Sequence, residues 1–357
     1  MKRINLAIAQ QTMRIRTEKE LLAIVDDSRI GEIIMFVEKR NEKKDKYRWR
    51  DKKRITYYPI EAMDRVAKIL EKHKIDIVHT HNFPDKIGKY FIGIRDSRRF
   101  NSKYNLNFKV VHEVHDTGWF YTEMGHYSNR KMKVRHDEKY VMQKSDGLVF
   151  CSETQLMFLW GKYEFPYNRG IIIYPSASKY HVPSMIKKPK NKQLTLVYCG
   201  SLGNDMGDYR LIFKDLLDKG FKIVIYTSRP GVSAQYEDEG IEIRSEWRYR
   251  EMLKDLSKMD GGIIPDYNGR NIQYYTIFGN KLWDYLGAGI PIVYHQYCPW
   301  MMKNFVRCER VGYSFDEINS INIKSARARV QKHRDKYLME NNINKLIKLY
   351  YDVIKRK

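Results

Sequence analysis

Short apolar runs alternate with longer amphipathic segments along most of this chain. The apolar runs lie at 1–9, 32–37, 75–79, 108–114, 147–151 and 170–174 in the first half, and at 194–200, 222–226, 241–243 and 261–265 in the second. Segments with helical spacing separate them, for example at 60–72, 153–163 and 209–219. Strands that alternate with helices in this way pair in parallel, with helices on both faces of the sheet. The pattern therefore predicts an α/β chain with doubly wound sheets.

The alternation breaks once, between residues 176 and 193. This stretch follows Pro175 and carries a basic cluster of Lys187, Lys188, Lys190 and Lys192, a composition typical of a linker. A chain of 357 residues is long enough for two domains of ordinary size. We therefore predict an N-terminal domain at 1–175, a linker at 176–193 and a C-terminal domain at 194–340. An amphipathic helix at 341–357 is free to pack back on the first domain.

The chain is strongly basic, with 66 Lys and Arg against 43 Asp and Glu and a formal net charge of +23. Such a charge attracts nucleic acid, an anionic membrane surface, or nucleotide and phosphate ligands, and it does not choose among them. Basic residues dominate 39–54, where Tyr47 and Trp49 are interleaved. This stretch fits either an anionic-surface contact or a solvated loop.

The cysteines Cys151, Cys199, Cys298 and Cys308 are far apart and lack the spacing of a metal site. They indicate buried thiols in a reducing compartment. No apolar run reaches the length of about 18 residues that a membrane span needs, and the N-terminal run is too short for a signal peptide. We therefore expect a cytoplasmic protein, with any membrane contact peripheral and at the inner face.

Polar residues follow two of the predicted strands in the first half. His81 and Asn82 come after the run at 75–79, and His115 and Asp116 after the run at 108–114. Ligands bind at the carboxyl edge of open parallel sheets, so these loops are candidates for a site. His115 and Asp116 could act as a base and its orienting partner, or could be hydrogen-bonded turn residues.

The second half has two candidate anion-binding segments. Glycines at 200, 203 and 207 follow a strand and could let backbone amides approach a pyrophosphate, although the spacing matches neither the dinucleotide fingerprint nor the P-loop. Residues 279–293 indicate a loop, a short helix, a glycine stop and a buried strand. Lys281 and Asp284 then share one helical face, where they could meet a phosphate and a sugar hydroxyl or form an ordinary surface ion pair.

Several blocks of the sequence resemble, in the same order, the GT-B glycosyltransferases of the family 4 type, also called group 1. The blocks are IVHTHN at 77–82, VHD at 114–116, DGLVFCSE at 146–153, YPS at 174–176, VYCGSL at 197–202 and NKLWDYLGAGIPIV at 280–293. The resemblance covers nearly the whole chain. It implies the GT-B fold, in which two Rossmann-like doubly wound domains face each other across a cleft.

The resemblance also implies roles for individual residues. His115 would contact the donor sugar and its phosphate, and Asp284 would hold the ribose hydroxyls. Lys281 and the backbone at 200–203 would neutralise the diphosphate leaving group, as a departing diphosphate requires. The implied catalytic residues are His115 and Asp116. The implied donor-binding residues are Gly200, Ser201, Leu202, Gly203, Arg210, Glu246, Trp247, Arg270, Asn280, Lys281 and Asp284, and the acceptor-side residues are Gln11, Arg14, His81, Asn82 and Trp119.

Three features depart from the family pattern. Thr276 stands where many members have the first of two glutamates, and the turn after the first strand lacks its glycines. The segment 200–207 carries no cation, so Arg210, Lys281 or Arg270 would have to serve the phosphates. These departures leave open a catalytically inactive GT-B-like protein that binds or regulates.

We expect a glycosyltransferase of glycan biosynthesis that moves a sugar from a nucleotide-diphosphate donor to a glycan or lipid-linked acceptor. The family resemblance implies retention of configuration and no metal or other cofactor, with the UDP- or GDP-sugar as co-substrate. An anionic membrane surface is a possible partner. We do not expect this enzyme to have nucleic acid as a partner. A nucleic-acid-binding protein is the second alternative function, because of the positive charge.

Overall fold

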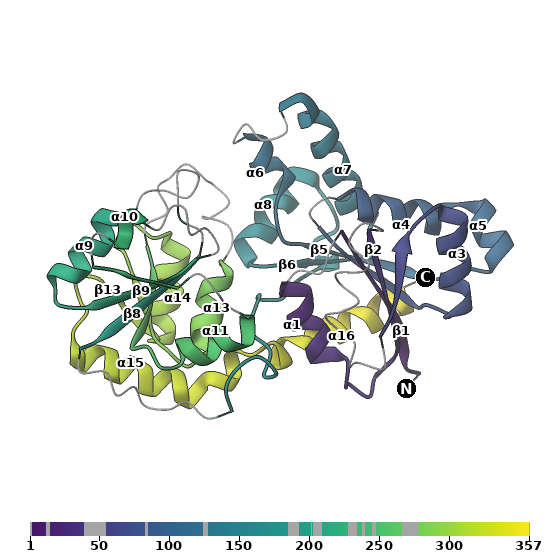
Figure 1. Ribbon diagram of the computed structural model, residues 1–357. Coiled ribbons are helices and arrows are strands. Elements are labelled where there is room, and N and C mark those ends of the chain that lie inside the picture. The colour runs from purple at the N-terminus through teal and green to yellow at the C-terminus, as the bar shows by residue number, and fades with distance from the viewer. Residues whose placement is uncertain are drawn as a thin grey trace. The chain divides into compact units, whose positions relative to one another are not determined.

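A computed structural model describes residues 2–11, 15–38, 55–82, 85–123, 128–184, 193–200, 202, 209–227, 234–237, 240–244, 248–265 and 278–356. The chain forms two compact units, Met1–Tyr174 with Asn342–Lys357 and Pro175–Asn341. Each unit contains one parallel sheet with helices around it (Figure 1). The basic stretch at 39–54 lies outside the described residues.

The sheet of the first unit has seven strands among the described residues, in the order β3-β2-β1-β4-β5-β6-β7, and all neighbouring pairs are parallel. The strands are β1 (Ile4–Gln10), β2 (Ile30–Glu38), β3 (Ile55–Ile60), β4 (Ile77–His81), β5 (Lys109–Val114), β6 (Gly147–Phe150) and β7 (Gly170–Ile172). The predictions named every strand of this sheet except β3. Its side chains are only partly buried, so its apolar signal is weak.

Helices cover both faces of this sheet. They are α1 (Ile15–Ile24), α3 (Met63–Lys72), α4 (Lys86–Asp96), α5 (Arg98–Tyr104), α6 (Gly118–Glu123), α7 (Lys131–Lys144), α8 (Glu153–Tyr163) and α16 (Met339–Lys355). In Figure 1, α3, α4 and α5 lie on one side of the sheet, and α1 and α16 lie on the other. The helix α16 therefore packs on the sheet of the first unit through its residues from 342 onward.

The alternation of side chains along β4 sorts residues between the two faces. Val78 joins the apolar core that includes Ala67 and Phe91 from α3 and α4. His79, one position later, meets the hydroxyl of Tyr350 in α16 at 2.7 Å. His79 and His81, two residues apart, therefore both point to the face of α1 and α16.

The sheet of the second unit has six parallel strands among the described residues, in the order β10-β9-β8-β11-β12-β13. They are β8 (Thr195–Cys199), β9 (Lys222–Tyr226), β10 (Glu242–Arg244), β11 (Gly261–Ile264), β12 (Ile292–Tyr294) and β13 (Gly312–Ser314). The helices are α9 (Arg210–Asp218), α10 (Ala234–Glu237), α11 (Tyr249–Leu256), α13 (Asn280–Gly287), α14 (Trp300–Glu309) and α15 (Ser320–His333).

The absence of a side chain at Gly262 allows α13 to pack directly on β11. A Cβ at this position would lie 2.3 Å from the ring of Tyr285, so only glycine permits this approach. The hydroxyl of Tyr285 in turn accepts a hydrogen bond from the backbone N–H of Cys199, at 2.9 Å. This contact ties α13 to the end of β8, where the predicted phosphate-binding segment begins.

The first residues of the segment predicted as a linker are packed in the second unit. Ser176, Ala177 and Ser178 are fully buried, and Ala177 pairs with Leu338 in an isolated β-bridge. Small side chains permit this close packing. Residues 185–192, with the predicted basic cluster, lie outside the described residues. In the part of the chain that the structure describes, no helix is both long and apolar enough to span a bilayer.

Candidate functional site

The strand order of each sheet reverses at one point, and the predicted site residues lie at both reversals. In the first unit the chain winds outward in opposite directions from β1 and β4, and in the second unit from β8 and β11. In sheets with this strand order, ligands bind at the carboxyl ends of the two central strands. His81 ends β4, and Gly200 directly follows β8.

Asn82 joins the loops that follow β4 and β5. Its Oδ1 accepts hydrogen bonds from the backbone N–H groups of His115 and Asp116, at 2.6 and 3.1 Å. Its Nδ2 donates to the carbonyl of Asp116 at 2.5 Å. Asn82 and His81 were predicted to lie on the acceptor side; both side chains are buried, and the Asn82 amide shapes the loop that carries His115 and Asp116.

His115 lies against two ionisable neighbours on the same face of the sheet. Its Nε2 is 3.2 Å from Oε1 of Glu113 and 3.0 Å from Nδ1 of His81. Burial, together with the charge of Arg16, lowers the pKa of His115. The imidazole is therefore neutral near pH 7.

Glu113 is a fully buried carboxylate that the predictions did not include. Burial alone would raise its pKa, but the guanidinium of Arg16 and the nearby histidines hold it well below the usual range. The Nε of Arg16 pairs with Oε1 of Glu113, and its other nitrogens donate to Sγ of Cys151 at 2.6 Å and to the carbonyl of Ile173 at 3.1 Å. The spacing of Glu113 and His115 could have indicated a shared face, but Arg16 is remote in sequence.

Glu20, His79, His81 and Glu113 are the described group that most resembles a set of metal ligands. The atoms do not fit a metal ion closely, because His81 Nε2 and Glu20 Oε2 are 4.0 Å apart and tetrahedral zinc ligands at about 2.1 Å from the ion are about 3.4 Å apart. Arg16 already pairs with both carboxylates. Burial and the charge of Glu113 raise the pKa of Glu20 well above its usual value, so a proton and a guanidinium balance this cluster.

Trp119 lies in α6, shortly after Asp116. Its ring is flanked by the cations of Arg135 and Lys162, each 3.6 Å from the ring centroid, which is the geometry of cation–π contacts. The carboxylate of Glu138 accepts the backbone N–H groups of Gly118 and Trp119, at 2.7 and 3.0 Å. Glu138 therefore anchors the start of α6, and with it the position of the indole.

Replacing Glu138 with glutamine is expected to flatten the pH dependence of stability. Burial, with the charge of Asp85, raises the pKa of Glu138 from 4.5 to about 8. The folded state then binds this proton more tightly than the unfolded state, so stability is lost as the pH rises between these two values. Urea denaturation measures the free energy of unfolding of both proteins. The difference, Glu138→Gln minus native, should increase from about pH 5 to about pH 8, because only the native protein loses this stability. The exposed Glu153→Gln serves as control, and parallel curves for Glu138→Gln and the native protein would contradict the assignment.

In the second unit, Lys281 reaches the end of β8. Its Nζ is 3.1 Å from the hydroxyl of Tyr198 and lies 4.5 Å from the centroid of that ring. A Cβ on Gly200 would be 2.6 Å from Cε of Lys281, so the lysine stem passes directly over the glycine backbone. A cation thus lies at the carboxyl edge of the sheet, at the reversal of strand order.

Asp284 lies one turn after Lys281 in α13, and it is buried. The hydroxyl of Tyr249, the first residue of α11, donates to Oδ1 of Asp284 at 2.5 Å. The predictions did not include Tyr249, and no local pattern indicates a contact between residues 35 positions apart. The pair gives the carboxylate a defined orientation.

The other residues predicted to bind the donor differ in burial and in position. Leu202 is fully buried in the apolar core, so only its backbone could meet a ligand. Asn280 is exposed at the first position of α13, and Arg210 begins α9. On the acceptor side, Gln11 follows β1 and lies near Glu38, with Nε2 and Oε2 3.4 Å apart. The predicted residues Arg14, Ser201, Gly203, Glu246, Trp247 and Arg270, and also Thr276, lie outside the described residues.

Replacing Gly200 with alanine is expected to weaken binding of a nucleoside diphosphate about tenfold, or about 1.4 kcal/mol. The new Cβ would lie 2.6 Å from Cε of Lys281 and 2.9 Å from the hydroxyl of Tyr198, and the φ of +158° at Gly200 disfavours any side chain, so the lysine and the local backbone must both shift. Calorimetric titration with UDP and GDP measures the loss, and the melting temperature should also fall. Gly161→Ala, where a Cβ meets nothing within 4 Å, is the control. Unchanged affinity in Gly200→Ala would exclude Lys281 from the binding site.

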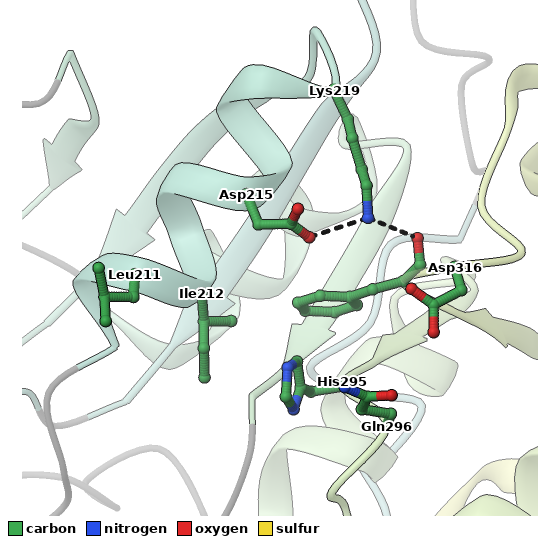
Figure 2. Close-up of a pocket in the computed structure, with 8 residues that line it drawn as sticks. Leu211, Ile212, Asp215, Lys219, His295, Gln296 and Asp316 are labelled. Carbon is green, nitrogen blue, oxygen red and sulfur yellow. Dashed lines mark hydrogen bonds and ion pairs between the residues drawn. The ribbon is translucent and has the colours of Figure 1, made fainter.

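A hollow of about 300 Å³ in the second unit contains none of these residues (Figure 2). It lies between α9 and the loops after β12 and β13, and its walls include Leu211, Asp215, His295 and Phe315. Lys219 bridges it by donating to Oδ2 of Asp215 and to the carbonyl of Phe315, at 2.9 and 3.2 Å. The side chain of Leu211 is largely exposed, so the hollow is open to solvent.

No protein-family model matches this chain, and no curated protein matches its sequence. Solved structures do match over its whole length. A glycosyltransferase from Rickettsia africae has a TM-score of 0.64 at 12% identity, with 100% of both chains covered. WaaG, a glycosyltransferase involved in lipopolysaccharide biosynthesis, has a TM-score of 0.63 at 12% identity, with 99% of this chain and 100% of that chain covered.

A third match is HepE from Anabaena in complex with UDP-glucose, with a TM-score of 0.58 at 9% identity and coverage of 98% of this chain and 96% of that chain. At these identities the likeness establishes the fold alone. The two parallel sheets agree with that fold. The chain has the GT-B fold, with two Rossmann-like domains, that glycosyltransferases such as these share.

Proposed function

We propose that this protein is a glycosyltransferase that uses a nucleotide-diphosphate sugar as donor and a glycan or lipid-linked acceptor. The observation that carries the proposal is the placement of Lys281 and Asp284 on one face of α13, where Nζ of Lys281 lies over Gly200 at the end of β8. A cation and a carboxylate about one helical turn apart match the diphosphate and the ribose of such a donor.

Each part of the donor has a chemical counterpart in the second unit. The diphosphate leaves with additional negative charge, which Lys281 and the N-terminal end of α13 would stabilise. The ribose hydroxyls can donate hydrogen bonds to the carboxylate of Asp284, whose orientation Tyr249 defines. The solved HepE complex contains UDP-glucose, so a donor of this class is compatible with the fold.

The first unit would contribute His115, near the donor sugar, and Trp119 on the acceptor side. A neutral imidazole can exchange hydrogen bonds with sugar hydroxyls, and an indole offers a flat apolar face to a sugar ring. We further propose that transfer retains the anomeric configuration and needs no metal, and that the basic charge favours an anionic membrane surface as the place of reaction.

A ligand screen followed by an activity assay tests the proposal. Thermal shifts with UDP, GDP, ADP and their sugars should identify one nucleotide that raises the melting temperature, because a ligand of the native state stabilises it. Hydrolysis or transfer of the corresponding sugar should then be measurable, and Asp284→Asn should weaken both. If no nucleotide binds to the folded protein and no donor is consumed, the proposal is wrong. If a donor binds and no sugar is released, the protein is an inactive binding member of the fold.

A further inference from the structure

We infer that Glu113 is a positioning residue that fixes the orientation and the tautomer of the His115 imidazole. The consequence for catalysis rests on the proposed function. The inference about the tautomer does not, because it concerns only contacts within the first unit.

One buried carboxylate is surrounded by nitrogen atoms from three elements. Oε1 of Glu113 pairs with Nε of Arg16 from α1 and lies 3.2 Å from Nε2 of His115. Oε2 lies 3.3 Å from Nε2 of His79 and 3.5 Å from Nδ1 of His81, both in β4. These are ion-pair distances, and Nε2 of His115 also lies 3.0 Å from Nδ1 of His81, so this ring nitrogen faces both the carboxylate and the second imidazole.

The charge on Glu113 determines which nitrogen of His115 carries the proton. Nε2 of His115 can donate to His81 Nδ1 or accept from it, but a lone pair on Nε2 would lie 3.2 Å from an ionised carboxylate oxygen, which repels it and stabilises an N–H there. Arg16 keeps Glu113 ionised, and Arg16 is itself held by Cys151 and by the carbonyl of Ile173. His115 therefore carries its proton on Nε2, and Nδ1 keeps its lone pair.

Burial and the charge of Arg16 favour the neutral ring of His115 and outweigh Glu113 and Asp116, which act in the opposite direction. Several ionisable groups surround this ring. They comprise Arg16 and Glu20 of α1, His79 and His81 of β4, Glu113 of β5, Cys151 after β6 and the adjacent Asp116. Burial lowers the pKa of both His115 and His81, and burial raises the pKa of Glu20 and of the Cys151 thiol. Arg16 and Glu113 are then the charged pair of the buried cluster.

This tautomer restricts what His115 can bind. A lone pair on Nδ1 accepts a hydrogen bond, so it suits a sugar hydroxyl and not an ionised phosphate oxygen, which has no proton to donate. On the proposed function, His115 would therefore meet a sugar hydroxyl and not a phosphate oxygen. The sequence resemblance had implied contacts with both the sugar and its phosphate.

The tautomer can be measured directly. We would record long-range ¹H–¹⁵N spectra of protein labelled at histidine, with the His115 signals assigned from their loss in His115→Gln. The native protein should show the Nε2–H form. In Glu113→Gln, His115 should change to a mixture of tautomers or to the Nδ1–H form, and kcat/KM for transfer should fall about tenfold or more. The inhibition constant of UDP or GDP, which reports binding of the diphosphate portion alone, should change little.

Glu20→Gln is the matched control, because Glu20 is also buried and also pairs with Arg16. The histidine nearest to Glu20 is His81, whose Nε2 is 4.0 Å from Oε2 of Glu20. This replacement should leave the tautomer unchanged and kcat/KM within about twofold. If Glu113→Gln does not fold, Arg16→Met/Glu113→Gln removes both charges and should give the same loss of the Nε2–H form. A pure Nε2–H form in folded Glu113→Gln or in the double variant would overturn the inference. A native protein that shows this tautomer but consumes no donor would instead refute the proposed function.

Discussion

Replacing Lys281 with methionine is expected to lower kcat/KM for sugar transfer by about two to three orders of magnitude. Methionine preserves the apolar stem that passes over Gly200 and removes the charge that would meet the departing diphosphate. Steady-state transfer with the donor found in the ligand screen measures the effect. Because the charge acts most strongly as the leaving group departs, kcat should fall further than binding of the intact donor.

The control for this prediction is Lys214→Met in α9. Lys214 is largely exposed, and among the described residues it pairs only with Asp218, at 3.3 Å. Such a surface ion pair contributes little to stability. Its replacement should leave kcat/KM within about twofold of the native protein. Native kinetics in Lys281→Met would mean that another cation serves the diphosphate, and the role proposed for α13 would be wrong.

Arg16→Met is expected to destabilise the protein by about 3–5 kcal/mol, because it leaves the buried carboxylate of Glu113 without its cation. Without Arg16, burial raises the pKa of Glu113, so the folded state takes up a proton and stability falls as the pH rises. The loss should therefore be larger at about pH 8 than at about pH 5. Urea denaturation at both pH values measures it.

The double variant Arg16→Met/Glu113→Gln completes a double-mutant cycle that measures the interaction between Arg16 and Glu113. It removes both charges, so we expect it to be more stable than Arg16→Met alone by about 1–3 kcal/mol. Equal stability of the single and double variants would show that Arg16 stabilises the fold through packing on its apolar stem. Arg65→Met, at an exposed ion pair with Glu61, should change the free energy of unfolding by less than about 1 kcal/mol.

Much of the fold was predictable because the signals of a parallel α/β protein are local. The helix at 153–163 was predicted with the bounds that the structure has, since Ser152 provides an N-cap whose side chain accepts from the N–H of Gln155. Elements with weaker signals were missed. The pattern did not indicate α4, α14, β13 or α15; β13 has only three residues, and α15 has a mixed composition without a clear apolar stripe.

The site was predictable only in part, for a related reason. His115, Lys281 and Asp284 follow or begin elements that the pattern located, so their position at a sheet edge followed from the order of elements. Their partners did not follow. Tyr249 reaches Asp284 from another helix, and Arg16 reaches Glu113 from α1, which is far away in the sequence.

The sequence by itself determined the two parallel sheets, the strand ends that carry the histidines and the helix that carries Lys281 and Asp284. Periodicity and glycine position encode these features within short windows, where local sterics and burial act. Only the tertiary structure decided that Asn82 shapes the loop of His115 and that Arg16 keeps Glu113 charged. Such contacts depend on which strands become neighbours, and no local pattern records the free energy of burying one charge beside another.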